Sequence, residues 1–469
     1  MAKRTQIPAE SVSRQREIAR DIYTLHQKRD TPPKALVDTY GCQQNEADSE
    51  TIRGYLRDMG YVFTDCEKEA DLIILNTCTV RESAANRIWG RVGALVHTKR
   101  DKPDQRIAIC GCMAQQESTV QRAEQSFRHV DLVFGPHALW RLPELMHSLL
   151  TEGKRIFDIA DPDGVIAEDL PQDRVEGPSA WLSIMYGCNN FCSYCIVPHV
   201  RGRERSRSPE KILEDVRRLV ADGVKDITLL GQNVNSYGEG LEEDLDFAGL
   251  LERINKIPGD FLIRFMTSHP KDANERLFAT MANCEKVAKH IHLPVQAGNS
   301  RVLEAMNRGY TKEGYLDLIA CARKYMPDIV FTSDIIVGFP GETEAEFEDT
   351  MDVLEKVQFD ALFTFIFSPR SGTPAADLED PVTRAEKQVW FDRLVTLQNS
   401  ISLKKHEAYV GQTVRVLVDG TGEDEQYPRK ARTNGHRLVR FAGDESLIGS
   451  FVDVEIISAS TWSLTGKLL

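Results

Sequence analysis

From about residue 35 onward, short apolar runs alternate with amphipathic stretches, and this alternation is the feature that most limits the possible folds. Short apolar runs of this kind are typical of buried strands, whereas the stretches between them have the period of a helix. Strands that alternate with helices form parallel sheets, because the chain must cross back over the sheet between neighbouring strands. We therefore predict a multidomain α/β protein built on parallel sheets.

A first series of strands is predicted at residues 35–37, 71–75, 106–109 and 130–134, followed by a helix that reaches residue 150. After the first strand, Asn45 is the expected N-cap of a helix that ends at Gly60. The series predicts a parallel α/β domain over residues 33–150. Residues 1–32 are expected to be a charged N-terminal extension.

Residues 151–178 are rich in acidic residues, Pro and Gly, which is typical of a linker. A second series of strands follows at residues 181–185, 226–230, 262–266, 290–293, 330–337 and 361–366. Six βα units favour a partial (βα)6 barrel over residues 179–408, with its chemistry at the carboxyl ends of the strands.

The pattern changes to period two near the C-terminus. Strands are expected at residues 413–418, 437–441 and 451–457, separated by Gly and Asp turns. This pattern predicts a small antiparallel β-barrel over residues 409–469, a fold that often binds nucleic acid.

Cys188, Cys192 and Cys195 form a C-x3-C-x2-C motif directly after the first strand of the second series. Three thiolates occupy three corners of a 4Fe-4S cube, so one iron stays open to chelate S-adenosylmethionine (SAM) and to give it an electron. Homolysis of the sulfonium bond then yields a 5′-deoxyadenosyl radical. The alternative is a structural zinc site, for which His199 is the nearby fourth ligand.

Cys42, Cys78 and Cys112 each follow the carboxyl end of a strand in the first series. Because these ends meet at one edge of a parallel sheet, the three thiols are expected to meet there and to hold a second cluster with an open iron. The alternative is that they are ordinary buried thiols, like Cys66, Cys284 and Cys321. Cys110 is ambiguous, since it lies beside Cys112.

Strand ends of the second series carry groups suited to holding SAM. Gly-rich turns allow close backbone approach, amide oxygens accept from the methionyl ammonium, and an arginine pairs with its carboxylate. The candidates are Gly231, Gln232, Asn233, Arg264, Gln296, Gly338 and Gly341. The alternative for the glycines is that they form simple turns. No catalytic residue is singled out beyond the six cysteines.

The densest positive patch follows the cysteine motif and contains Arg201, Arg203, Arg205 and Arg207. Arginine binds phosphate bidentately, so the patch is a candidate RNA contact, although a charge run is often only a solvated face. The net charge of −13 argues against diffuse nucleic-acid binding.

The N-terminal stretch has no apolar segment of a secretory signal, and no apolar run is long enough to span a membrane. Ten cysteines without such a signal favour metal ligands or buried thiols over disulfides. We therefore expect a cytoplasmic protein.

Several motifs together resemble one family, the radical-SAM methylthiotransferases, and within it the MiaB type that acts on tRNA. The resemblance covers residues 33–469 and rests on six segments: 40–49, 76–82, 110–115, 186–207, 230–237 and 334–343. Departures are small: the charged N-terminal extension, Gln44 where Met is usual, the extra Cys110, and Ser371 where Pro is more usual.

The resemblance implies an enzyme with two 4Fe-4S clusters and SAM as cofactors. Cys42, Cys78 and Cys112 would hold the auxiliary cluster, Cys188, Cys192 and Cys195 the radical-SAM cluster, and the C-terminal barrel would be an RNA-binding TRAM domain. One SAM would methylate a sulfur on the auxiliary cluster and a second would supply the radical. The implied product is the 2-methylthio form of N6-isopentenyladenosine at position 37, in the anticodon stem-loop of tRNA. An external electron donor and a sulfur source are implied as partners.

Two alternatives stay open from the sequence. One is a methylthiotransferase that acts on threonylcarbamoyl-adenosine 37 of tRNA or on an aspartate of a ribosomal protein. The other is a non-catalytic iron-sulfur protein that binds RNA or carries electrons, which leaves the cysteine spacing and glycine-rich strand ends unexplained.

Overall fold

The computed structural model describes residues 6–79, 82–159 and 164–469. Val80 and Arg81 of a motif named above, residues 1–5 of the predicted extension and residues 160–163 of the predicted linker lie outside the described residues. The chain forms two compact units. Unit one is Met1–Glu176, Met185–Asn189 and Ile196–Arg207, and unit two is Gly177–Ile184, Asn190–Cys195 and Ser208–Leu469. This division leaves the predicted domain boundaries untested.

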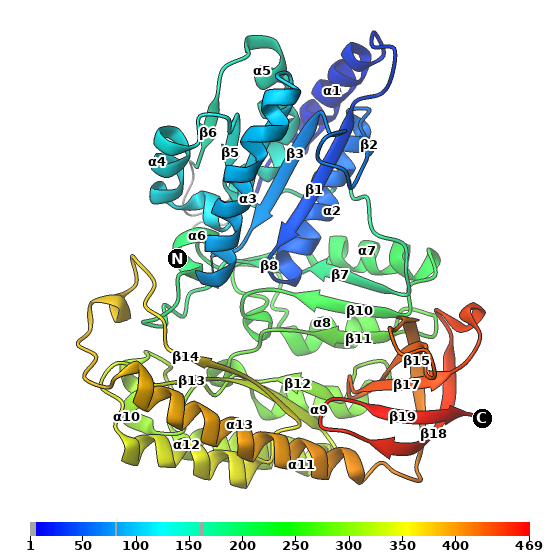
Figure 1. Ribbon diagram of the computed structural model, residues 1–469. Coiled ribbons are helices and arrows are strands. Elements are labelled where there is room, and N and C mark those ends of the chain that lie inside the picture. The colour runs from blue at the N-terminus through cyan, green and yellow to red at the C-terminus, as the bar shows by residue number, and fades with distance from the viewer. Residues whose placement is uncertain (1–5, 80–81, 160–163) are drawn as a thin grey trace. The chain divides into compact units, whose positions relative to one another are not determined.

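Unit one is built on a parallel six-stranded sheet in the order β2-β1-β3-β4-β5-β6 (Figure 1). Its strands are β1 (Lys34–Tyr40), β2 (Val62–Phe63), β3 (Leu72–Thr77), β4 (Arg106–Gly111), β5 (Leu132–Phe134) and β6 (Ile156–Asp158). The parallel sheet confirms the predicted fold class. Two short edge strands, β2 and β6, were not predicted, because each is too short to show a period. A further short pair, β8 (Met185–Tyr186) and β9 (Arg205–Ser206), is antiparallel.

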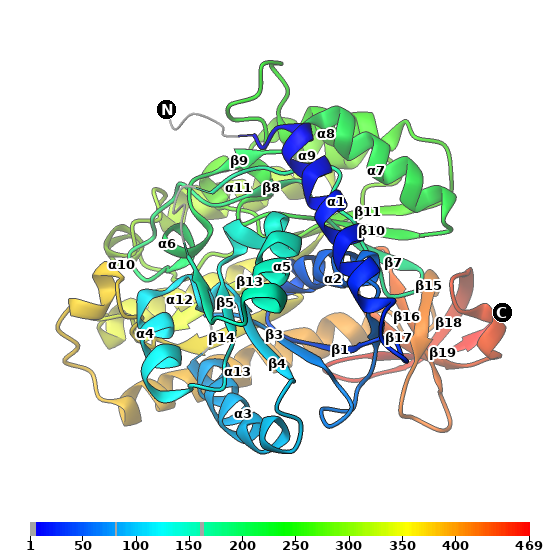
Figure 2. The same ribbon diagram turned by 90° about the horizontal axis from the view of Figure 1, so that it is seen from above.

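Helices cover both faces of this sheet (Figure 2). One face packs on α1 (Ala9–His26), α2 (Gln43–Asp58) and α5 (Leu142–Glu152), and the other on α3 (Glu82–Asp101) and α4 (Glu117–Ser126). Within the N-terminal extension, α1 buries Ala19 and Ile22 in the core. Asn45 is not the N-cap of α2, because the helix begins at Gln43 after Cys42, and the Asn45 side chain bonds to the neighbouring strand instead.

Unit two contains six parallel strands that follow one another in chain order. They are β7 (Ser179–Ser183), β10 (Asp226–Leu230), β11 (Leu262–Phe265), β12 (His290–His292), β13 (Val330–Val337) and β14 (Ala361–Ile366). They form two three-stranded sheets, and a parallel bridge between Ile263 and Val287 joins them beside β12. This is the predicted partial (βα)6 arrangement.

The helices of the chain from α6 onward complete these elements. They are α6 (Val197–Arg201) in unit one, and α7 (Pro209–Ala221), α8 (Phe247–Asn255), α9 (Glu275–Asn283), α10 (Ser300–Ala305), α11 (Lys312–Tyr325), α12 (Glu344–Val357) and α13 (Arg384–Glu407) in unit two. Figure 1 shows α11, α12 and α13 along one side of β12, β13 and β14. No helix among the described residues has the length and apolar character needed to cross a membrane.

The C-terminal segment closes into a five-stranded barrel, as predicted, in the order β15-β16-β17-β19-β18. Its strands are β15 (Thr413–Thr421), β16 (Arg429–Thr433), β17 (Leu438–Ala442), β18 (Phe451–Ala459) and β19 (Leu464–Leu468). The sequence did not predict β16 and β19, whose polar and glycine residues mask the alternation. A buried ion pair and two hydrogen bonds tie the barrel to the rest of unit two. Arg437 pairs with Asp360, and Arg264 donates to the main-chain oxygens of Thr433 (2.9 Å) and Asn434 (2.6 Å).

Gly111 ends β4 with a φ of +89° and is in register with Thr77 of β3. A Cβ at this position would lie 2.4 Å from Asn76 Oδ1 and 2.5 Å from the Thr77 oxygen. We expect Gly111→Ala to lower the free energy of unfolding by about 1–3 kcal/mol, measured by thermal denaturation. Gly90→Ala is the matched control, because its Cβ meets nothing within 4 Å inside α3 and should be stabilising by about 1 kcal/mol. Equal melting of the two variants would contradict this account.

Candidate iron-sulfur sites

Cys42, Cys78 and Cys112 lie at one edge of the sheet of unit one. They follow β1, β3 and β4, which are adjacent, and the strand ends are in register: Tyr40 is opposite Thr77, and Thr77 is opposite Gly111. The structure therefore brings together the three sequence-distant cysteines of the predicted auxiliary site.

Asn45 connects these strand ends. Its Nδ2 donates to Asn76 Oδ1 (2.8 Å) and to the Thr77 oxygen (3.2 Å), while its Oδ1 accepts from the Cys42 thiol (3.4 Å). Asn76 Nδ2 donates back to the Asn45 oxygen (2.8 Å). This buried amide pair fixes the start of α2 against β3, and with it the position of Cys42.

The electrostatics at this edge lower the pKa of Cys42 and raise that of Cys112. A hydrogen bond from Cys78 lowers the pKa of Cys42 to about 6, and the positive charge of Arg201 acts in the same direction. Burial raises the pKa of Cys112 although Arg201 opposes it. The Arg201 Nε donates to Cys112 Sγ (3.0 Å), and its Nη2 pairs with Asp48 (2.6 Å).

The ambiguity over Cys110 is answered by its position. Its side chain is buried in the core beneath α1, α2 and α5, and burial raises its pKa well above the usual value. Cys110 is therefore a core thiol and not part of the three-cysteine edge.

The donor set fits an iron-sulfur cluster with three protein ligands. Within the described parts of the chain, no three His, Cys, Asp or Glu side chains converge on a single metal ion. The thiolates of a cubane bind three different irons, so they stand farther apart than the ligands of one ion. The same observation gives no support to the zinc alternative with His199, which is exposed on α6.

The second cysteine motif lies within the short stretch 188–195. In unit one, Cys188 donates its main-chain N–H to the Gly202 oxygen (3.1 Å). In unit two, the Cys195 N–H donates to the Cys192 oxygen (2.9 Å), and Ser193 bonds through its main chain to Met306 (3.0 Å) and Ala375 (2.8 Å). These contacts hold the loop that carries Cys192 and Cys195 against the segment after α10.

Arg308 and Tyr310 are functional candidates that sequence reasoning missed. Arg308 donates from Nη1 to Cys192 Sγ (3.3 Å), from Nη2 to the Pro294 oxygen (2.8 Å) and from Nε to Tyr310 Oη (2.9 Å). Tyr310 Oη also lies 2.8 Å from the Val295 oxygen. The run of residues 306–310 carries no metal or nucleotide motif, so only the fold reveals that it supports the cysteine loop.

The candidate SAM residues other than Arg264 follow the carboxyl ends of their strands. Asn233 Nδ2 donates to Asp272 (2.7 Å) and Asn235 Nδ2 to the His269 oxygen (2.9 Å), which joins the loops after β10 and β11. Gln296 has a φ of +71°, a strained value for a residue with a side chain and one that recurs at ligand sites. Gly231 and Gln232 belong to the first of these loops.

Gly338 and Gly341 form the turn after β13, with φ of +71° and +76°. The buried carboxylate of Glu342 accepts the N–H groups of Gly338 (2.6 Å) and Phe339 (3.2 Å). Burial raises the pKa of Glu342 to about 7. Glu342 thus supports this turn from inside, a role that its place in a glycine-rich motif did not reveal.

Arg264 does not point to the mouth of the partial barrel, which corrects its assignment to the SAM carboxylate. Its Nε donates to Asp226 (2.7 Å), the first residue of β10, and its Nη atoms bond to the turn between β16 and β17. The guanidinium therefore lies toward the amino ends of the strands. Its function is to join the C-terminal barrel to the sheet.

The four arginines after the cysteine motif do not form one exposed patch. Arg207 pairs with Glu168 (2.6 Å), Arg205 donates to the main-chain oxygens of Arg201 and Arg203, and Arg201 contacts Cys112 and Asp48. Burial and these contacts argue against phosphate binding by Arg201, Arg205 and Arg207. Arg203 is exposed, and phosphate contact there stays a prediction.

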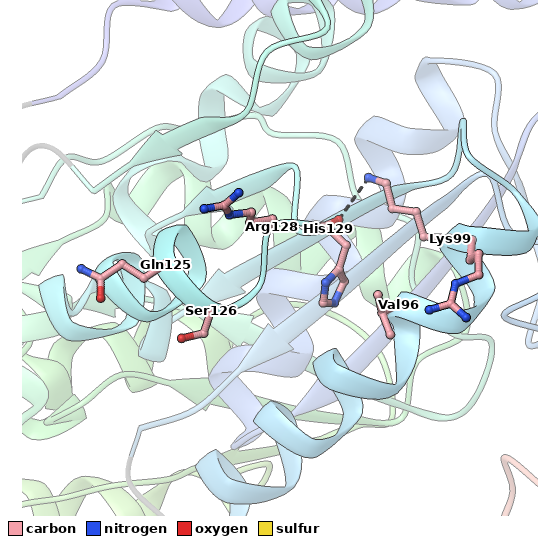
Figure 3. A pocket seen from close by; sticks show the side chains of 7 residues that line it. Val96, Lys99, Gln125, Ser126, Arg128 and His129 are labelled. Atoms are coloured by element: carbon pink, nitrogen blue, oxygen red, sulfur yellow. Dashed lines mark hydrogen bonds between the residues drawn. The ribbon is translucent and has the colours of Figure 1, made fainter.

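A shallow pocket of about 590 Å³ lies elsewhere in unit one, beside the ends of α3 and α4 (Figure 3). It is lined by Val96, Lys99, Arg100, Gln125, Ser126, Arg128 and His129. Lys99 donates to the His129 oxygen (3.1 Å) and pairs with Asp131. The pocket lies at the amino edge of the sheet, opposite the cysteines. Its cations offset the negative ends of two helices, which accounts for their position without a ligand.

Family comparisons assign all three parts of the chain. Residues 182–354 match the Radical SAM superfamily, residues 34–135 match Uncharacterized protein family UPF0004, and residues 407–469 match the TRAM domain. The chain therefore combines a radical-SAM domain with a UPF0004 domain before it and a TRAM domain after it.

Similar proteins extend over the whole chain. The tRNA-2-methylthio-N(6)-dimethylallyladenosine synthase of Acetivibrio thermocellus is 48% identical, covering 100% of this chain and 98% of that protein. The protein of the same name from Alkaliphilus oremlandii is 46% identical, covering 100% of both chains. The chain therefore belongs to the tRNA-2-methylthio-N(6)-dimethylallyladenosine synthase family, the MiaB-type methylthiotransferases.

Solved structures support the fold. The radical SAM methyltransferase TsrM from Kitasatospora setae, with cobalamin and a [4Fe-4S] cluster bound, matches with a TM-score of 0.54 at 15% identity, covering 74% of this chain and 77% of that one. The cobalamin-dependent radical enzyme OxsB matches with a TM-score of 0.51 at 16% identity, covering 80% of this chain and 57% of that one.

If the two cysteine sets hold separate clusters, anaerobically reconstituted protein should contain about eight irons per chain. Replacing Cys188, Cys192 and Cys195 together by Ala should leave about half of the iron, and replacing Cys42, Cys78 and Cys112 should do the same. Cys66, which was predicted to be a buried thiol, is exposed and lies outside both sets. Cys66→Ala is therefore the control and should retain all of the iron. Full iron content in either triple variant, measured by colorimetric iron assay, would refute the assignment of that set.

Proposed function

We propose that the enzyme adds a methylthio group to C2 of N6-isopentenyladenosine at position 37 of tRNA. The observation that carries this proposal is the pair of three-cysteine sets in a chain of this family. The C2–H of an adenine is too weakly acidic for any side-chain base at neutral pH, so acid-base chemistry does not suffice. Cluster cofactors and SAM meet this need, and the chain uses both.

The residues have separate tasks in this proposal. Cys188, Cys192 and Cys195 hold the cluster that, with SAM bound, supplies an electron for radical formation. Cys42, Cys78 and Cys112 hold the cluster that carries the sulfur. The loops with Gly231, Gln232 and Asn233, with Gln296, and with Gly338 and Gly341 hold SAM and orient it.

An exposed apolar surface in unit two suits the prenyl group of the substrate. Phe363 and Phe365 on β14 are 50% and 43% exposed. They are opposite Asp334 and Ile336 of β13, so these four side chains share one face of the sheet. The other face of β13, with Phe331 and Ile335, is buried on the side of the helices. The phenylalanines therefore face the inside of the partial barrel, where a base can lie.

The same face disfavours a substrate that carries a carboxylate. Asp334 lies among these side chains, 3.5 Å from His292 Nε2, and His292 contacts the Phe363 ring edge-on. An acidic group repels the carboxylate of threonylcarbamoyl-adenosine or of a protein aspartate. Two exposed aromatic rings instead gain from burying a dimethylallyl group.

The C-terminal barrel supplies a surface for the RNA backbone. Lys430 and Arg440 are directly opposite on β16 and β17, and neither makes an ion pair with any described residue. Like charges in this position destabilise a sheet unless an anion lies between them. A phosphate of the anticodon stem-loop is such an anion.

The proposal includes three further features. The enzyme works in the cytoplasm on tRNA, it receives electrons from an external donor, and it receives sulfur from an external source. The base at position 37 leaves the loop stack to reach the inner face of the partial barrel, as single-stranded loop bases can.

A substrate comparison tests the role of the phenylalanines. Stem-loops with isopentenyladenosine should gain the methylthio mass, whereas loops with threonylcarbamoyl-adenosine or plain adenosine should react far more slowly. Phe363→Ala with Phe365→Ala should lower kcat/KM for the prenylated loop by about tenfold or more, because the prenyl group loses its contacts. Val389→Ala, at an exposed position on α13, is the control. Faster turnover of threonylcarbamoyl loops, or of a ribosomal protein, would overturn the substrate assignment.

A salt titration tests the role of the barrel. Lys430→Gln with Arg440→Gln should weaken tRNA binding and reduce the slope of log K against log salt by about 0.7 to 0.9 per lost phosphate contact. Arg415→Gln is the matched control, since Arg415 is on the same barrel but pairs with Asp260 (2.6 Å). An unchanged slope in the double variant would place the phosphate contacts elsewhere.

A further inference from the structure

One sulfur in each cysteine set accepts a hydrogen bond from a buried arginine. In unit one, Arg201 Nε lies 3.0 Å from Cys112 Sγ. In unit two, Arg308 Nη1 lies 3.3 Å from Cys192 Sγ. Arg201 and Arg308 are 4% and 5% exposed as residues, so water screens neither charge effectively.

The two arginines differ in how their charge is balanced. Arg201 also pairs with Asp48, whose side chain is 12% exposed, at 2.6 Å. Arg308 makes no ion pair with a carboxylate in the part of the chain that the structure describes, and its other contacts are the Pro294 oxygen and Tyr310 Oη. A buried cation without an anion is costly. The thiolate of Cys192, and a cluster bound to it, is the anion that Arg308 faces.

A nearby cation changes the redox equilibrium of an iron-sulfur cluster. Reduction adds one negative charge to the cluster, and a positive charge that donates to a ligand sulfur stabilises this reduced form. The effect is largest for a buried cation and small for a cation whose charge a carboxylate cancels. Arg308 meets the first condition and Arg201 the second.

We propose that Arg308 and Arg201 are positioning residues that set the two clusters at different reduction potentials. Arg308 acts through Cys192 and raises the potential of the radical-SAM cluster, so that an external donor can reduce it. Arg201 orients Cys112, but its pair with Asp48 leaves the potential of the auxiliary cluster nearly unshifted. This inference rests on the assignment of the two cysteine sets in the proposed function.

The experiment uses full-length protein in which one cluster is present at a time. The variant without Cys42, Cys78 and Cys112 isolates the radical-SAM cluster, and its potential is measured by redox titration with EPR detection. Adding Arg308→Gln should lower the ratio of reduced to oxidised cluster about tenfold at a fixed solution potential, a shift of about 59 mV to more negative values. Arg308→Lys keeps the charge and should restore most of the potential.

A matched control removes a different arginine from the same region. Arg301 on α10 pairs with Glu346 and has an exposed side chain. Arg301→Gln should leave the potential unchanged. If Arg308→Gln causes loss of iron, the double variant Arg308→Lys with Tyr310→Phe is used instead. It keeps the positive charge but changes the hydrogen-bond geometry, so a smaller negative shift of the potential is expected.

The auxiliary cluster gives an independent test, in which a shift of the reduction potential in the opposite direction is expected. In the variant without Cys188, Cys192 and Cys195, Asp48→Asn removes the balancing charge and should shift the potential to more positive values. Adding Arg201→Gln to Asp48→Asn should reverse this shift.

The outcomes separate this proposal from the assignment beneath it. If the triple-cysteine backgrounds do not retain about four irons each, the cysteine assignment fails. If they retain them but Arg308→Gln and Asp48→Asn leave both potentials unchanged, the arginine proposal is overturned and the assignment stands.

Discussion

The register between parallel strands is the constraint on which the site of unit one depends. Main-chain hydrogen bonds align the ends of β1, β3 and β4, so the residues that follow them leave the sheet at one level. The main-chain hydrogen bonds between the strands set this arrangement, and no bound metal is needed for it. The buried Asn45 and Asn76 amides then fix the loops above the ladder, and a cofactor meets a site with little freedom left to lose.

In unit two, side chains and not strand register hold the cysteine loop in place. Its cysteine loop has no strand neighbour at Cys192, and Arg308 joins this sulfur to the end of β12 through the Pro294 oxygen. Tyr310 reaches the same strand end and contacts His269 edge-on. Arg308 and Tyr310 therefore connect the cysteine loop with the candidate SAM loop that carries Gln296 and with the loop after β11.

Much of this architecture follows from local patterns in the sequence. Periodicity and strand ends were sufficient for the parallel sheets, the partial barrel and the meeting of Cys42, Cys78 and Cys112, since each depends on short-range pattern plus a general rule of α/β folds. The roles of individual arginines were not predictable in this way. In the sequence, Arg264 and the arginines of residues 201–207 have the appearance of exposed cations. Only their tertiary partners, such as Asp226, Asp48 and Glu168, show that Arg264, Arg201 and Arg207 are internal. Arg308, with no motif around it, was missed for the same reason.

The attachment of the C-terminal barrel has a mechanical consequence. Asp360 stands directly before β14 and is bonded to Arg437, to Lys405 and to the main chain of β13, while Arg264 binds the turn after β16. Any rotation of the barrel against the strands would leave buried charges without partners, which is energetically costly. These contacts therefore oppose rotation of the barrel relative to β14. If Lys430 and Arg440 bind the RNA backbone, the distance from that contact to the inner face of the partial barrel is fixed. The nucleotide that reaches this face would then be selected by its position along the RNA backbone as well as by its chemistry.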